Sequence, residues 1–544
     1  MATQDNRFIR GAATLTAAGF VVKLIGALCR IPLYSILGSE GMGLFGMAYP
    51  IYAIMLTASS AGLNVAISRA VAERWALGRK EDARAAFRIS LVLMAAIGLA
   101  GSVGLYSLRG WIAANLAKDP RAAVSIGAIS PALFMASVLS ALRGWFQGIE
   151  EMMVPAVSQV LEQAGRLATM FLLAGALMSK GLEYAAAGAT FGAVVGAGIG
   201  VLYSVVAYRT QLGRQWFRER RERRRRPAEG VTDRGREVRQ GRESWTHAAR
   251  AVLSVAVPIS LASAVFGMTE LVDLSVVPGR LQAIGVPRED ATRLYGQLTQ
   301  AALPLINLAT VFTAALQMAI VPSVTAAVVL RDRPSARRRV GQALSITLAL
   351  ALPAAVGLYV LAGPIPWLLY GEEGIGPILR PAAPAILLLA LQQVTAGVLQ
   401  GLGKVTTPLV NLGVAIVVKA FLTYVLVEMP GVGVPGAALA TTVYFGVAAA
   451  LNLWAVYRHL GNVLDTDSLL RLSLASAGMA AVTGLTYRAA TGVLGGKFAA
   501  IPAIGAGAIC YGVLVLILKA FAPSDLESIP GVGNLVRRFS RKRG

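Results

Sequence analysis

The sequence predicts an all-α, polytopic membrane protein with about 14 transmembrane helices, arranged as two pseudo-twofold-related six-helix lobes plus two C-terminal helices. Three observations lead to this prediction. The 544 residues are 56% apolar and only 15% charged, with a mean hydropathy of +0.63, whereas soluble domains carry about 25% charged residues. The apolar residues fall into stretches of about 20, the length that a helix needs to cross a bilayer. Many of them also recur in an internal repeat of 253 residues.

The apolar stretches give the order of the elements. They lack the alternation over about ten residues that marks a transmembrane β-strand, so each is expected to form a helix. The stretches cover approximately 11–36, 43–70, 86–109, 122–147, 152–178, 184–208, 248–276, 295–328, 338–362, 380–402, 405–427, 435–457, 467–489 and 497–521.

The internal repeat assigns these stretches to two lobes. Gly148 matches Gly401 and Arg166 matches Lys419, both pairs being 253 residues apart. Because each lobe has an even number of helices, both are expected to enter the membrane in the same orientation, with a cavity between them. The expected segments are an N-lobe at 1–208, a basic linker at 209–247, a C-lobe at 248–460, two further helices at 461–523 and a basic tail at 524–544.

The net charge of +23 is concentrated in alternate loops. Lys and Arg gather at 74–84, 209–250, 331–339 and 537–543. Cytoplasmic loops carry such an excess, so both termini are expected in the cytoplasm. This distribution predicts no nucleic-acid partner. The linker is either solvated, which is the simpler interpretation, or binds anionic lipid headgroups.

Signatures of catalysis are absent from the sequence. The only two histidines, His247 and His459, lie at predicted cytoplasmic span ends, so no metal site or acid–base cluster is expected in the membrane. The run 431–436 matches G-x-G-x-x-G by chance, because no strand precedes it. Cys29 and Cys510 fall inside predicted spans, so no disulfide is expected. Because catalytic signatures are absent, we do not expect an enzyme, and because a P-loop is absent, we do not expect an ATP-driven pump. No cofactor is expected beyond an unidentified coupling cation.

Charged and amide side chains inside the spans are the candidates for function, because they are costly in the membrane unless they face a wet cavity or a partner. Four cations are assigned to a substrate-binding cavity: Lys23, Arg30, Arg166 and Lys419. The polar lining is assigned to Asn64, Gln159, Gln297, Gln300, Asn307 and Gln393. Three acidic side chains either neutralise these cations or hold a coupling cation: Glu162, Glu270 and Asp273.

Two of the intramembrane arginines also have simpler interpretations. Glu162 precedes Arg166 by four residues, so the two can form a purely structural ion pair on one helix. Arg143 lies near the cytoplasmic end of its span, so its side chain is expected to extend to the lipid headgroups.

Several short motifs resemble the stage V sporulation protein B branch of the polysaccharide-exporter families. This branch belongs to the superfamily that also contains multidrug extruders and lipid II flippases. The motifs are FVVKLIGALCRIPL at 20–33, GMGLFGMAYPI at 41–51, AGLNVAIS at 61–68, DLSVVPGRL at 273–281 and ALPLINL at 302–308.

The resemblance implies a flippase that moves an undecaprenyl-pyrophosphate-linked saccharide, such as lipid II, across the bacterial plasma membrane by alternating access. Lys23 falls where lipid II flippases carry a cavity arginine, and Arg30 lies about one position from a second. The arginine that lipid II flippases carry in their second helix has no counterpart within 55–60 of this sequence. Gln297 and Gln300 lie near the position of the arginine that those flippases carry in their eighth helix. We expect the lipid tail to lie against a groove formed partly by the last two spans.

Two other functions remain open at this point. A cation-coupled multidrug extruder of the same superfamily would use Glu270 and Asp273 as its coupling site. A non-transporting scaffold would recruit cell-wall or spore-envelope synthesis enzymes through the basic linker, and such enzymes are also conceivable partners of a flippase.

Overall fold

The computed structural model describes residues 28–57, 62–225, 267–463 and 465–520, together with Gly19, Val22, Ile25, Gly26 and Val265. Over these ranges all regular secondary structure is helical, and the chain divides into two compact units, Met1–Leu274 and Ser275–Gly544. Ten of the described helices are long and apolar enough to cross a membrane, or eleven if one bent pair forms a single span. The predicted all-α polytopic fold is therefore confirmed. Half of the predicted span 11–36 and most of the predicted span 248–276 lie outside the described residues.

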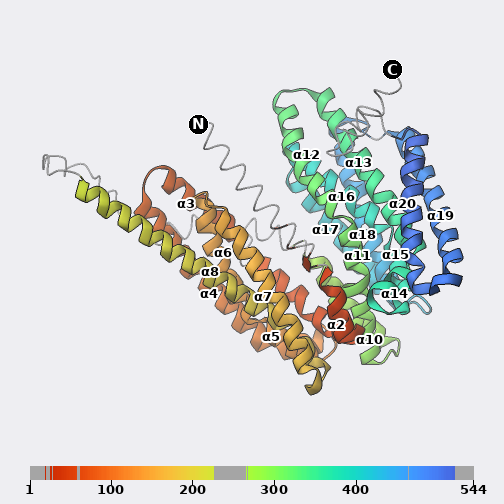
Figure 1. Cartoon of the computed structure of the whole chain (residues 1–544), viewed down its shortest axis with the longest axis horizontal. Helices are drawn as coiled ribbons and strands as arrows, with labels where there is room; N and C mark the ends of the chain where they lie inside the picture. The colour runs from red at the N-terminus through yellow and green to blue at the C-terminus, as the bar shows by residue number, and fades with distance from the viewer. Residues whose placement is uncertain are drawn as a thin grey trace. The chain divides into compact units, whose positions relative to one another are not determined.

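The described part of the first unit consists of long or broken helices (Figure 1). Gly38 interrupts α2 with a φ of 61°, a backbone conformation that glycine adopts without strain, and so separates the first two predicted spans. The helices are α2 (Arg30–Leu56), α3 (Gly62–Ala76), α4 (Lys80–Asn115), α5 (Ala122–Ile129), α6 (Pro131–Gly148), α7 (Met153–Leu177), the short 3₁₀ helix η2 (Met178–Lys180) and α8 (Leu182–Arg225).

Helices α7 and α8 pack side by side along their length (Figure 1). Glycines at four-residue spacing on α8 permit this close approach. A methyl group added at Gly192 would lie 2.6 Å from the carbonyl oxygen of Arg166, and one added at Gly196 would lie 2.5 Å from that of Glu162. Helix α8 continues to Arg225, so the first part of the predicted linker is helical.

A three-residue ion cluster fixes the turn before α5. The Arg121 guanidinium contacts the Asp119 carboxylate at 2.8 Å and the Glu40 carboxylate, which follows the break in α2, at 2.6 Å. Hydrogen bonding to Asp119 raises the pKa of Arg121 above its usual range. The cluster therefore holds the turns at Gly38 and at Asp119 together, with the guanidinium charged.

The second unit contains a larger set of helices, several of them short. They include α10 (Arg288–Gly296), the π-helical segment η3 (Gln297–Ala302), α11 (Leu303–Ala309), α12 (Val311–Val329), α13 (Arg333–Val360), α14 (Pro364–Tyr370), the 3₁₀ helix η4 (Glu373–Ile375), α15 (Gly376–Ala382), α16 (Ala385–Gly401), α17 (Thr406–Glu428), α18 (Val434–Leu460), α19 (Thr466–Phe498) and α20 (Ala500–Ile517).

The stretch 295–328, predicted as one span, is divided into η3, α11 and α12. Pro304, at the start of α11, lacks a backbone N–H and cannot continue a regular helix, and a π-helical turn precedes it. Thr310 then separates α11 from α12. The apolar content of the sequence predicts how long this segment is. It does not predict the π-helical turn or the breaks between the three helices.

Aspartates cap two helices of the second unit. The Asp332 carboxylate accepts a hydrogen bond from the Ser335 N–H at 3.0 Å, before α13. The Asp465 carboxylate accepts from the Asp467 N–H at 3.1 Å and from the Ser468 hydroxyl at 2.6 Å, before α19. These hydrogen bonds hold the pKa of both carboxyl groups below the usual range. A side-chain oxygen at this position satisfies backbone donors that the first turn of a helix leaves without partners.

The internal repeat is visible inside each unit. Left-handed residues end equivalent helices 253 positions apart: Gly78 and Arg331, Lys118 and Gly371, Glu150 and Gly403. Glycine contacts between neighbouring helices repeat as well. A methyl group at Gly148 would meet Ser68 and Val71, and one at Gly401 would meet Val321 and Val324, which are the equivalent residues of the second unit.

Candidate functional site

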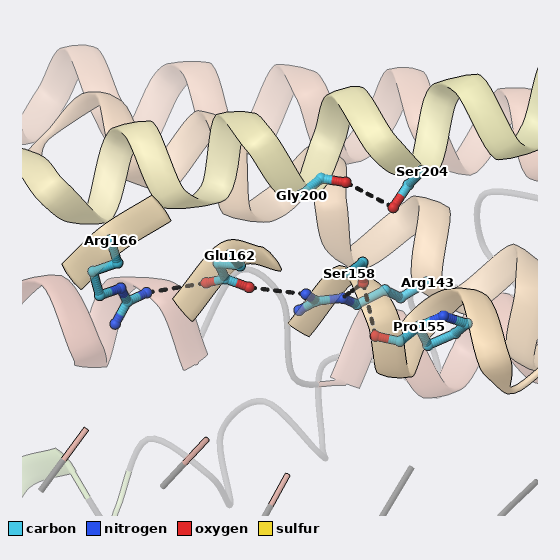
Figure 2. A network of polar contacts seen from close by, with 7 residues as sticks. All are labelled: Arg143, Pro155, Ser158, Glu162, Arg166, Gly200 and Ser204. Atoms are coloured by element: carbon cyan, nitrogen blue, oxygen red, sulfur yellow. Dashed lines mark hydrogen bonds and ion pairs between the residues drawn. The ribbon is translucent and has the colours of Figure 1, made fainter. Parts of the chain in front are cut away.

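Two arginines share one carboxylate inside the first unit. Arg143 comes from α6, and Glu162 and Arg166 lie one turn apart on α7. The Arg143 Nη2 atom is 2.9 Å from Glu162 Oε2, and the Arg166 Nη2 atom is 3.0 Å from Glu162 Oε1. Figure 2 shows Glu162 between the two guanidinium groups. We call these three residues the arginine–glutamate triad.

The triad is only partly neutralised. Its two guanidinium groups and single carboxylate leave one positive charge, and the side chains of Arg143, Glu162 and Arg166 are 16%, 18% and 25% exposed. Nε of Arg166 is buried and has no hydrogen-bond acceptor among the described residues. An arginine has five N–H donors in a planar fork, so Arg166 retains donors for an incoming anion.

The expectation that Arg143 extends to the lipid headgroups was wrong. Its Nε donates to the Ser158 hydroxyl at 2.8 Å, while its Nη2 contacts Glu162. The Ser158 hydroxyl in turn donates to the Pro155 carbonyl oxygen at 2.8 Å (Figure 2). This pairing has no local signal in the sequence, because Arg143 and Glu162 lie on different helices that are brought together by the packing of α6 and α7.

Helix α8 supports the backbone that carries the triad. Gly192 and Gly196 lie against the main chain of Arg166 and Glu162, so α8 leaves little room for that turn of α7 to move. The Ser204 hydroxyl donates to the Gly200 carbonyl oxygen within α8 (Figure 2). The four-residue glycine spacing of α8 therefore positions the charged residues directly.

Lys419, the counterpart of Arg166 in the repeat, has different surroundings. Its side chain is fully buried on α17, and its ammonium lies 5.9 Å from the centroid of the Tyr444 ring on α18. The residue equivalent to Glu162 in the repeat is Ala415, and that equivalent to Arg143 is Ala396. The two units therefore keep a cation at the same place, and in the first unit Glu162, one turn before it, forms an ion pair with that cation.

An apolar cavity of about 450 Å³ lies within the second unit. Helices α11, α13, α14, α16, α19 and α20 line it, with side chains that include Leu305, Pro353, Ile386, Met479 and Ile504. Its volume falls in the range of about 300–1,000 Å³ found for ligand pockets, and its lining suits an alkyl chain.

Comparison with known proteins identifies the family. The family model for polysaccharide biosynthesis proteins matches residues 8–331, more than half of the chain. The chain belongs to the polysaccharide biosynthesis protein family. A second model, that of the MatE family, matches residues 299–425 of this polysaccharide biosynthesis protein.

Relatives of this polysaccharide biosynthesis protein extend over nearly its full length. It is 28% identical to stage V sporulation protein B of Bacillus subtilis (strain 168) over 98% of this chain and 99% of that protein. It is 26% identical to the lipid II flippase MurJ of the same organism over 90% of each chain. The solved inward closed structure of a lipid II flippase MurJ has the same fold, with a TM-score of 0.67 at 15% identity, covering 92% of this chain and 98% of that one. The protein is thus a multi-pass membrane protein with a MurJ-like fold.

Several predicted lining residues of the second unit make polar contacts between elements. The Thr313 hydroxyl on α12 donates to Gln393 Oε1 on α16 at 2.8 Å. Gln297 is 4% exposed and donates to Glu372 at 2.8 Å, and Gln300 is 6% exposed. The Oε1 atoms of both glutamines are buried without a donor in the described part of the chain. Since η3 carries both amides, its irregular backbone sets where they lie.

The other predicted site residues of this family member are spread over both units. Gln159 on α7 is half-buried. A methyl group added at Gly19, in the first predicted span, would lie 3.8 Å from Gln159 Oε1. Lys23 lies outside the described residues. The remaining residues differ in burial: Arg30 and Asn64 are half-buried, Asp273 is buried, and Glu270 and Asn307 are exposed. Their assigned roles stay predictions.

Proposed function

We propose that this protein moves an undecaprenyl-pyrophosphate-linked saccharide, lipid II or a related cell-wall precursor, from the inner to the outer leaflet of the bacterial plasma membrane. The observation that carries the proposal is the arginine–glutamate triad, which places an incompletely neutralised pair of guanidinium groups within a membrane-spanning bundle. Similarity to stage V sporulation protein B and to lipid II flippase MurJ supports the same class of substrate.

The pyrophosphate is the part of this substrate that is hardest to move across the membrane without a protein. Its negative charge must cross about 30 Å of hydrocarbon, and charge-assisted hydrogen bonds from arginine offset the loss of water. Arg166 would bind the headgroup, with Lys419, Lys23 and Arg30 as further proposed cations of the path. Amide side chains such as Gln159 would bind the sugar hydroxyls. A negative-inside potential favours outward movement of an anion by about 2.3 kcal/mol per charge per 100 mV.

The apolar cavity of the second unit would hold part of the prenyl tail. Its walls include residues of α19 and α20, the two helices that follow the repeat. An alkyl segment in this cavity would make van der Waals contacts with its apolar walls and would need no polar partner. The headgroup and the tail would thus be bound by different parts of the chain.

The same proposal includes the topology and the partners. Both termini would be cytoplasmic, because the basic segments then lie on the inner side. The two lobes would alternate in their access to the two sides of the membrane. The basic linker would contact anionic lipids, and cell-wall synthesis enzymes would use the translocated precursor.

Complementation tests the substrate and the triad together. A bacterium depleted of its lipid II flippase would receive the wild type, Arg166→Gln, Arg166→Lys or Lys180→Gln; the last changes an exposed cation on η2, away from the triad. We expect the wild type and Lys180→Gln to restore growth, Arg166→Lys to restore it partly, and Arg166→Gln to fail at equal membrane abundance. Failure of the wild type, or full rescue by Arg166→Gln, would contradict the proposal.

A second candidate function is a cation-coupled multidrug extruder, favoured by the MatE match over 299–425. It would use the acidic residues Glu270 and Asp273 for coupling. Sodium- or proton-dependent efflux of a cationic dye, lost in Asp273→Asn and kept in Arg166→Gln, would establish this function in place of the flippase.

A further inference from the structure

A surface pocket in the first unit contains an arginine that the proposed transport path does not use. Tyr106 and Arg109 of α4 form one wall, and small residues of α5 form the rest: Ala123, Val124, Gly127 and Ala128. The cavity has a volume of about 400 Å³. None of its lining residues is acidic.

The sequence of α4 sets the depth of this pocket in the bilayer. Twenty uncharged residues separate Arg88 from Arg109. At about 1.5 Å per helical residue they span about 30 Å, the thickness of the hydrocarbon layer. The exposed aromatic side chains of Tyr106 and Trp111 lie beside Arg109 in sequence, and such residues gather at the level of the headgroups. Arg109 is therefore at the depth where lipid phosphates lie.

The geometry holds Arg109 in place and leaves most of its donors available. Its guanidinium lies 3.8 Å from the centroid of the Tyr106 ring, and its Nη1 donates to the Tyr106 carbonyl oxygen at 2.8 Å. A methyl group at Gly127 would lie 2.9 Å from Arg109 Cδ, so glycine makes room for the side chain. In the same unit, the carboxylates of Asp119 and Glu40 contact Arg121.

We propose that this pocket binds the phosphate of an anionic membrane phospholipid in the leaflet at the C-terminal end of α4. The guanidinium would donate to the phosphate oxygens, while the acyl chains lie along the exposed apolar face of α4, which includes Leu99 and Val103. A freely soluble anion has no acyl chains and would not contact that face. The site is separate from the triad and from the basic linker, and it does not depend on the proposed function.

Native mass spectrometry of the purified full-length protein tests the site, with phosphatidylglycerol, phosphatidylcholine and inorganic phosphate as probes. We expect Arg109→Gln to weaken phosphatidylglycerol binding at the tightest site about tenfold, and the control Lys180→Gln to leave it unchanged. Gly127→Val keeps the arginine but fills the pocket, and should weaken binding similarly. The atoms nearest to its added Cβ belong to the side chains of Arg109 and Tyr106 and not to the backbone, so folding should be retained.

Three results would overturn the inference. These are unchanged phosphatidylglycerol binding in both pocket variants, equal affinity of the wild type for phosphatidylcholine, and full displacement of the lipid by millimolar inorganic phosphate. Thermal unfolding of each variant would be measured alongside, and if Arg109→Gln is destabilised, Gly127→Val provides the deciding comparison.

Discussion

Glu162 accepts hydrogen bonds from two arginines at once and can neutralise only one of them. It therefore has a dual role at the residue scale. It lowers the cost of placing Arg143 and Arg166 in a largely apolar bundle, yet leaves one positive charge for a ligand. A carboxylate held by two guanidinium groups in a poorly hydrated site contributes more than an exposed ion pair, because solvent screens it less.

Replacing Glu162 by glutamine should destabilise the first unit by about 2–3 kcal/mol, since hydrogen bonds to charged groups contribute about 1.5–3 kcal/mol each and two guanidinium groups would then repel each other. Thermal unfolding in detergent would measure the loss. The double variant Arg143→Gln, Glu162→Gln should recover part of it, because it removes one of the two repelling charges. A double variant that is as unstable as the sum of the two single ones would show that the triad is not coupled.

At the scale of elements, the contact of α7 with α8 decides where the triad lies. The four-residue glycine spacing indicates close packing from the sequence alone. What it does not indicate is which residues of the partner helix are contacted. The structure shows that these are the backbone atoms of Glu162 and Arg166, so the packing of α8 positions the charged residues.

Gly196→Ala should separate α7 from α8, because its methyl group would lie 2.5 Å from the Glu162 carbonyl oxygen. Overpacking of this kind costs about 1–3 kcal/mol, and the shift of α7 should also lower transport. Gly198→Ala is the matched control on the same helix, since its methyl group would meet no atom within 4 Å. Unfolding midpoints and complementation for the two variants would be compared. Equal effects would exclude the contact as the cause.

At the scale of the whole molecule, the two units repeat the same helix endings. Glu150 and Gly403 both adopt left-handed backbone conformations, with φ of 62° and 76°. The N–H of each donates to the carbonyl oxygen three residues earlier, Gln147 in one unit and Gln400 in the other. Glycine adopts this conformation without a steric penalty, whereas other residues are strained.

Glu150→Gly should therefore raise stability by up to about 1 kcal/mol, and Gly403→Ala should lower it by a similar amount. Glu150 is exposed and no atom lies within 4 Å of a methyl group at Gly403, so neither change disturbs packing. Chemical or thermal unfolding in detergent would measure both. Effects of the same sign in the two variants would mean that the backbone conformation is not the cause.

The sequence by itself determined the membrane class, the order of most helices and the duplication, because long apolar stretches and a constant offset are local, countable signals. It also identified Glu162 and Arg166 as a pair one turn apart. Only the tertiary structure decided that Arg143 joins them and that Lys419 is enclosed beside Tyr444. It also decided that six helices of the second unit leave a cavity between them. These features depend on which faces of distant helices meet, and an apolar residue that faces lipid looks the same in sequence as one that faces another helix.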